Sequence, residues 1–76
     1  MSDTTLSQFI REKRKLLGLT QEELSFKAGV GLRFVRELET GKPTLRMDKV
    51  NQVLKLFGYE LGATEINRKK LTDEES

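Results

Sequence analysis

The sequence predicts a mainly α fold of four short helices, in which the second and third form a helix-turn-helix pair, followed by a short C-terminal strand. Three observations support this fold class. Apolar residues recur at helical spacing in four segments, each of which is closed by a glycine. Within residues 20–42 the apolar side chains could not be buried together by one straight helix, so the chain has to turn at Gly29. After Gly58 the helical spacing gives way to alternation.

Length and composition exclude several function classes. The chain has 76 residues, enough for one domain with a small core, and it contains neither cysteine nor histidine. The chain therefore lacks the residues needed for disulfides, for thiolate or histidine metal sites and for nucleophilic triads. We expect no enzyme, no cofactor and no metal. No apolar run approaches the ~18 residues of a membrane span, and the N-terminus lacks a signal-peptide pattern. We expect a cytoplasmic protein that makes no membrane contact.

The first helix is expected to begin after Thr5, which forms a capping box with Gln8, and to stop at Gly18. Its charged residues Arg11 and Lys15 are assigned to solvent, with Arg14 nearer the boundary. Its core stripe is predicted to comprise Leu6, Phe9, Ile10, Leu16 and Leu17.

The second and third helices are expected at residues 21–28 and 32–40. Thr20 and Glu23 form another capping box, and Gly29 can adopt the left-handed conformation that the turn requires. The two helices are predicted to lock together through Leu24, Ala28, Val30, Val35 and Leu38. Phe26 and Phe34 do not fit these positions: each lies either at the core edge or on the surface, where it would indicate a protein-binding site.

The fourth helix is expected at residues 46–57, with a core stripe of Met47, Val50, Val53, Leu54, Leu56 and Phe57. The alternating segment that follows places Tyr59, Leu61 and Ala63 on one face. A lone strand cannot satisfy its backbone hydrogen bonds, so the simplest partner is the same strand of a second copy. The alternative is an irregular tail. We therefore predict a domain at 1–66 that includes a dimerisation strand, and a disordered charged tail at 67–76.

Basic residues gather around the third helix and the loop after it. The net charge is only +2, but the pI of about 9.1 is on the side typical of nucleic-acid binders. The cluster comprises Arg33, Arg36, Lys42, Arg46 and Lys49. Its alternative interpretation is a solvated helix face.

The chain resembles a known superfamily of DNA-binding proteins. The matching positions are Gln21, Leu24, a small residue at 25, Ala28, Gly29, Val30, Val35, Leu38 and Glu39. They resemble the helix-turn-helix of the phage repressor and Cro superfamily, which implies a repressor-like domain whose second motif helix lies in the major groove. Residues 31–61 look more narrowly like HipB-like antitoxins, whose partners are HipA-type toxin kinases and which form dimers through a strand at this position. The resemblance covers roughly residues 5–66, and it assigns Glu39 a structural role.

If the third helix docks in a major groove, its first exposed residues and those one turn later face the bases. Arg33 can donate a bidentate pair to guanine, and Arg36 can reach a neighbouring base or a phosphate. Leu32 can touch a thymine methyl, while Glu37 can accept from cytosine N4 or orient one of the two arginines. These four residues are the predicted base contacts.

Phosphate contacts need donors at helix starts and in loops. The predicted set is Thr20, Gln21, Gly31, Thr40, Lys42, Thr44 and Arg46. The resemblance supports Gln21, whereas Thr20 could equally be a helix cap that never touches DNA.

The leading hypothesis is a dimeric repressor that reads an inverted-repeat operator in double-stranded DNA, controls its own operon and serves as antitoxin to a HipA-like kinase. A dimer of this kind should read two half-sites about 34 Å apart. The alternatives are a stand-alone regulator without a toxin partner, and a protein-interaction adaptor that keeps the scaffold but no longer binds DNA.

Overall fold

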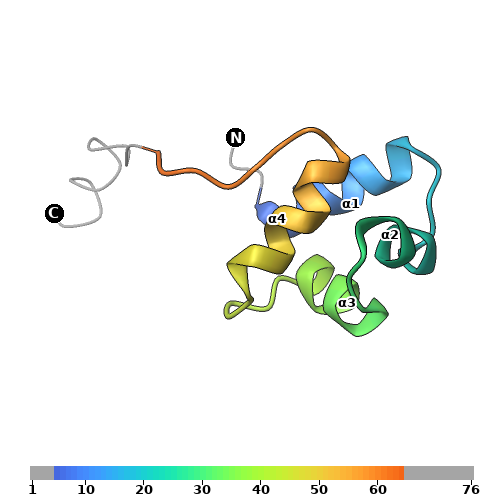
Figure 1. Cartoon of the computed structure of the whole chain (residues 1–76), viewed down its shortest axis with the longest axis horizontal. Coiled ribbons are helices and arrows are strands. Elements are labelled where there is room, and N and C mark those ends of the chain that lie inside the picture. The colour runs from blue at the N-terminus through green and yellow to red at the C-terminus, as the bar shows by residue number, and fades with distance from the viewer. Residues whose placement is uncertain (1–4, 65–76) are drawn as a thin grey trace, which may run out of the picture.

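The computed structural model describes residues 5–64, and four helices make up most of this range (Figure 1). They are α1 (Leu6–Leu16), α2 (Gln21–Ala28), α3 (Leu32–Thr40) and α4 (Met47–Leu56). These bounds confirm the four predicted helices, with Arg46 and Phe57 as the caps of α4. Helix α3 packs on α1 and α2, and α4 packs on α2. None of the helices within residues 5–64 is long and apolar enough to cross a membrane.

Local capping explains where α1 and α2 begin. The Thr20 hydroxyl accepts from the Glu23 N–H at 3.0 Å, and the Glu23 carboxylate accepts from the Thr20 N–H at 2.8 Å. Thr5 and Gln8 form the same reciprocal pair, with both distances at 3.2 Å. Both predicted capping boxes are therefore confirmed.

The corner between α2 and α3 depends on Gly29, whose φ of +75° lies in the left-handed region. The N–H of Gly29 and that of Val30 both donate to the Ser25 carbonyl at 3.0 Å. The Gln52 amide of α4 lies 3.4 Å from the carbonyl oxygens of Ala28 and Gly29. The last carbonyls of α2 thus find partners both within the turn and on a helix distant in sequence.

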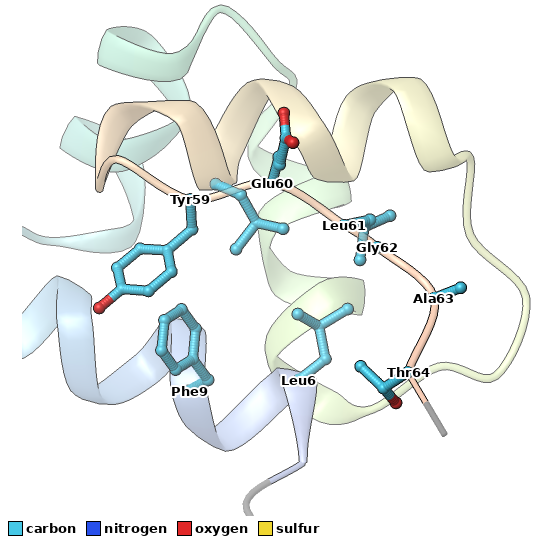
Figure 2. A pocket seen from close by; sticks show the side chains of 9 residues that line it. Leu6, Phe9, Tyr59, Glu60, Leu61, Gly62, Ala63 and Thr64 are labelled. Atoms are coloured by element: carbon cyan, nitrogen blue, oxygen red, sulfur yellow. The ribbon is translucent and has the colours of Figure 1, made fainter. Parts of the chain in front are cut away.

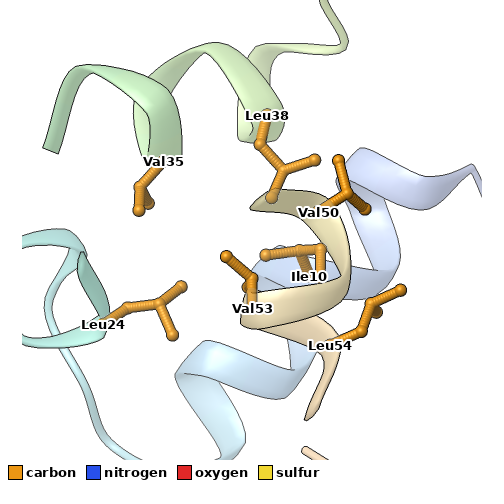
Figure 3. Packing of buried hydrophobic residues seen from close by; sticks show 7 residues of the cluster. All are labelled: Ile10, Leu24, Val35, Leu38, Val50, Val53 and Leu54. Atoms are coloured by element: carbon orange, nitrogen blue, oxygen red, sulfur yellow. The ribbon is translucent and has the colours of Figure 1, made fainter. Parts of the chain in front are cut away.

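One apolar cluster lies between the four helices (Figure 3). Its fully buried members are Ile10, Leu24, Val35, Leu38, Val50, Val53 and Leu54, all of them predicted core positions. Partly buried side chains surround this cluster, among them Leu6, Phe9, Ala28, Val30, Phe34 and Phe57. The periodicity of the helices therefore identified these seven buried positions correctly.

Four predicted core positions are wrong. Leu16 and Leu17, at the C-terminal end of α1, are 77% and 56% exposed, and Met47 and Leu56, the first and last residues of α4, are 67% and 38% exposed. Each lies at a helix end, where the stripe continues past the elements that could cover it. One turn after Ile10, the inward position is taken by Arg14 instead.

Arg14 forms an ion pair with the buried Glu39 of α3. Its Nε and Nη2 donate to the two carboxylate oxygens at 2.7 and 3.1 Å, and Nη1 donates to the Leu19 carbonyl at 2.8 Å. The Gln21 amide of α2 donates to the same carboxylate at 3.0 Å. Glu39 is only 2% exposed. One carboxylate therefore joins three helices, which confirms a structural role for Glu39.

The segment after α4 is held against the helices without forming a strand within residues 5–64. The Tyr59 ring packs edge to face against the Phe9 ring, with centroids 4.9 Å apart. The Lys13 Nζ atom lies 5.4 Å from the centroid of each ring. The Leu61 N–H donates to the Asn51 side chain at 2.8 Å. Together with Leu6, Phe9 and Leu54, residues 59–64 border an open hollow of about 730 Å³ (Figure 2). The predicted tail at 67–76 lies outside the described residues.

Substitution of Arg14 by Met keeps an unbranched side chain but removes the charge, which leaves Glu39 buried without its cation. Breaking a buried pair from one side costs about 3 to 5 kcal/mol, and a core of this size supplies about that much in total. We therefore expect Arg14→Met to be largely unfolded at room temperature in circular dichroism melts. Lys15→Met, at the exposed neighbouring position, should change the free energy of unfolding by less than about 0.5 kcal/mol. Indistinguishable melts for the two variants would rule out this stabilising role.

Candidate nucleic-acid interface

Helix α3 divides cleanly into a buried face and a solvent face. Val35 and Leu38 are buried, whereas Arg33 and Arg36 are exposed. The Arg33 side chain is 92% exposed, so almost all of it is available to a ligand. Leu32, the first residue of the helix, is half-buried. Of the four predicted base contacts, the two arginines are therefore the most exposed.

Glu37 brings two of the predicted contact residues together. Its Oε2 atom lies 3.5 Å from the Nε of Arg33 and 3.4 Å from the Nζ of Lys42. Arg33 precedes Glu37 by one helical turn, while Lys42 follows the helix in the next loop. Arg36 forms no ion pair with any residue between 5 and 64. The structure thus favours orientation of Arg33, and not of Arg36, by Glu37.

The backbone after α3 reinforces this arrangement. Gly41, with a φ of +84°, ends the helix, and the Lys42 N–H donates to the Glu37 carbonyl at 3.1 Å. The Thr40 hydroxyl donates to the same carbonyl at 3.0 Å. Thr44 is exposed in the loop that follows. The start of this loop is therefore ordered by Glu37, whereas Thr44 is free to meet a partner.

The start of α2 offers two further donors. Thr20 is exposed, and its hydroxyl oxygen accepts the cap bond, which leaves the hydroxyl proton available to a phosphate. The Gln21 side chain uses one amide proton on Glu39 and retains a second. The two interpretations of Thr20, cap and phosphate contact, are therefore compatible. Because Gln21 reaches Glu39, the start of α2 lies beside the C-terminal end of α3.

Gly31 and Arg46 precede α3 and α4 and differ in their availability. Gly31 is exposed, and α3 has no side-chain cap, so its first N–H groups are open. Arg46 instead donates to both oxygens of Asp48, at 2.7 and 3.2 Å, and this contact lowers the pKa of the Asp48 carboxyl. A phosphate would have to compete with Asp48 for the Arg46 guanidinium.

Comparison with known proteins agrees with this geometry. Residues 10–63 match a family model described as helix-turn-helix. A protein of Sinorhizobium fredii, named uncharacterized HTH-type transcriptional regulator y4mF, is 49% identical over 56 residues, which cover 74% of each chain. This chain belongs to the helix-turn-helix family. In this helix-turn-helix protein, α2 and α3 are the paired helices of the motif, and DNA binding with a role in transcription regulation is the function that the family supports.

Sequence reasoning did not find the internal partners of two basic residues in this helix-turn-helix domain. Arg14 was placed near the boundary and Arg11 in solvent, yet Arg14 pairs with the Glu39 carboxylate and Arg11 donates to the Glu39 carbonyl. Nothing in the spacing of α1 identifies an acceptor more than twenty residues away. The one available signal was the structural role that the resemblance assigned to Glu39.

Proposed function

We propose that this protein is a sequence-specific transcriptional repressor that binds double-stranded DNA as a homodimer, with α3 in the major groove. The observation that carries the proposal is the pair of exposed arginines, Arg33 and Arg36, on the solvent face of the second motif helix. The opposite face of this helix is buried, so only the arginine face can approach a duplex. A regulator of this kind acts in the cytoplasm, where the DNA is.

The proposed reading mode follows from the side chains. Arg33 donates to guanine O6 and N7, and Arg36 reads a neighbouring base or a phosphate. Leu32 is only half-buried, so the exposed part of its side chain can contact a thymine methyl. Phosphate contacts by Thr20, Gln21, Gly31, Thr40, Lys42, Thr44 and Arg46 would fix the register of the domain on the duplex. Among these, Thr44 is exposed, whereas Lys42 already pairs with Glu37 and Arg46 with Asp48.

The test of this function is fluorescence anisotropy with the promoter fragment of its own operon and a scrambled fragment. Specific readers prefer their site by about 10³-fold or more. With six to ten phosphates neutralised, affinity should fall by about 10³ to 10⁵ between 50 and 200 mM salt. Arg33→Ala should reduce the preference by about five- to 150-fold, the equivalent of the 1 to 3 kcal/mol that one bidentate contact discriminates. Equal weak binding to both fragments would favour the adaptor alternative.

Two backbone features support homodimer formation through residues 59–64. The N–H groups of Tyr59 and Leu61 donate to the domain itself, to the Leu54 carbonyl and to Asn51. Within residues 5–64, no hydrogen bond involves the N–H groups of Glu60, Gly62, Ala63 or Thr64. In an extended chain, alternate N–H groups point to opposite sides, so those of Glu60, Gly62 and Thr64 would share the edge opposite Tyr59 and Leu61 and could pair with a second copy. Antiparallel pairing of two copies centred on residue 62 would place Glu60 opposite Thr64.

This register predicts that Gly62→Cys forms a disulfide-linked dimer under mild oxidation. Directly opposed residues of a hydrogen-bonded pair have Cα atoms about 5.5 Å apart, within the range that a disulfide spans. No atom lies within 4 Å of a Cβ built at Gly62, and the chain has no other cysteine. Glu12→Cys, on exposed α1, is the matched control and should remain monomeric on non-reducing gels. Equal cross-linking of both variants, or a wild-type protein that is monomeric in light scattering, would argue against the pairing.

The resemblance to HipB-like antitoxins adds a more specific proposal, in which the repressor also binds and neutralises a HipA-like kinase toxin. One observation favours a protein partner: the Phe26 side chain is 88% exposed, although a phenylalanine in a small domain normally lies at the core edge. The kinase itself is inferred from the resemblance alone. Without such a partner, the protein would be a stand-alone regulator.

Co-expression with a kinase encoded beside it provides the test. A tagged kinase should co-purify this protein, and Phe26→Ser should weaken the complex by about 30-fold, the effect of losing one interface hot spot. Operator affinity should remain unchanged. Lys27→Ser, at the adjacent exposed position, is the control and should leave both affinities intact. A kinase that never co-purifies would leave the stand-alone regulator as the function.

A further inference from the structure

The carboxylate of Glu37 lies on the face of α3 that carries the proposed DNA-reading arginine, where an acid is electrostatically unfavourable. DNA presents a dense row of phosphates, so any carboxylate at the interface is repelled. Glu37 is nevertheless a half-buried residue whose side chain is only 31% exposed, and the two partners of its Oε2 atom are both cations, Arg33 and Lys42. Its position therefore calls for an explanation other than solvation.

We propose that Glu37 is a positioning residue that raises the sequence discrimination of the domain by restraining Arg33 and Lys42 together. This inference rests on the proposed function. It assigns Glu37 to one of the two roles that the sequence left open, orientation of an arginine, in place of acceptance from cytosine N4.

The geometry explains how Glu37 can hold Arg33 without blocking it. The carboxylate faces the Nε of Arg33, at 3.5 Å. The guanidinium retains its two terminal nitrogens, which can donate end-on to guanine O6 and N7. A side chain that is 92% exposed would otherwise sample many rotamers. The ion pair with Glu37 limits this sampling in the free protein, which lowers the entropy lost on binding DNA. The ion pair thus restrains Arg33 along the helix, beside Glu37, before DNA binds.

Lys42 is held by the same residue twice. Its Nζ lies 3.4 Å from the carboxylate, and its backbone N–H donates to the Glu37 carbonyl at 3.1 Å. A proposed base contact and a proposed phosphate contact therefore share one anchor. In the proposed complex, this shared anchor would let the base contact of Arg33 and the phosphate contact of Lys42 form together.

The charge of Glu37 also opposes non-specific binding. Arg33 and Lys42 carry two positive charges, and the carboxylate between them reduces the local sum to one. Contact with phosphates alone gains from every net positive charge, whatever the sequence. Glu37 should consequently weaken binding to random DNA more than it weakens binding to the operator, where the arginine contact compensates.

The decisive variant is Glu37→Gln, which keeps the shape and removes the charge. By anisotropy at one fixed salt concentration, we expect tighter binding to scrambled DNA and at least a fivefold lower ratio of operator to scrambled affinity, the lower end for one bidentate contact. Glu12→Gln, the same charge change on the exposed surface of α1, should leave the ratio unchanged. Circular dichroism melts verify that both variants are folded.

A double-mutant cycle with Arg33→Ala separates positioning from direct base contact. If Glu37 acts through Arg33, Glu37→Gln should have no further effect on the ratio in the Arg33→Ala background. An undiminished effect there, or a loss of operator affinity with no gain on scrambled DNA, would mean that Glu37 contacts a base and would overturn the proposal. The proposal would also be overturned if the wild-type protein prefers the operator and Glu37→Gln leaves the ratio of operator to scrambled affinity unchanged. The proposed function would then still stand. A wild-type protein without operator preference would refute both.

Discussion

The ion pair between Glu39 and Arg14 is the interaction on which the rest of the structure depends. The carboxylate is almost fully buried, and its oxygens accept from a guanidinium on α1 and an amide on α2. A buried charge is tolerated only when it is paired and hydrogen-bonded, so these donors cannot be exchanged freely. Apolar contacts are non-directional, so they constrain the angle between two helices less tightly. Hydrogen bonds with fixed donors and acceptors are directional, and they therefore constrain the relative orientation of the first three helices.

The same carboxylate links the fold to the proposed DNA contacts. Glu39 lies near the C-terminal end of α3, and Gln21, its partner on α2, is one of the predicted phosphate contacts. Two residues before Glu39, Glu37 orders the loop that begins at Lys42. The start of α2 and the start of this loop are thereby held near the same end of α3. A protein that positions itself on a duplex by its phosphates needs such donors at fixed spacing.

Local signals in the sequence predicted the helices and the exposed arginines, because caps, glycine stops and the 3.6-residue period act within a few residues. They did not predict the inward position of Arg14 or the exposure of Leu16 and Met47, because those outcomes depend on which distant element covers a helix end. The same limit applies to the segment after α4. Alternation placed Tyr59 and Leu61 on one face, and the structure packs both against the domain. The unpaired N–H groups of this segment, in contrast, could be identified only from the hydrogen bonds that Tyr59 and Leu61 make in the structure.

A small domain with a net charge of only +2 cannot rely on electrostatic attraction to find one site among many. Every added cation strengthens binding to the correct sequence and to all competing sequences alike, so affinity gained in this way brings no discrimination. Discrimination comes from contacts that form fully only on the correct bases. The exposed Arg33 could satisfy either role, since a guanidinium binds phosphate as readily as guanine. In the proposed complex, an acid one turn along the helix would bias Arg33 away from phosphate and leave its terminal nitrogens for a base, so a carboxylate on the proposed DNA-reading face is consistent with selection for specificity over affinity.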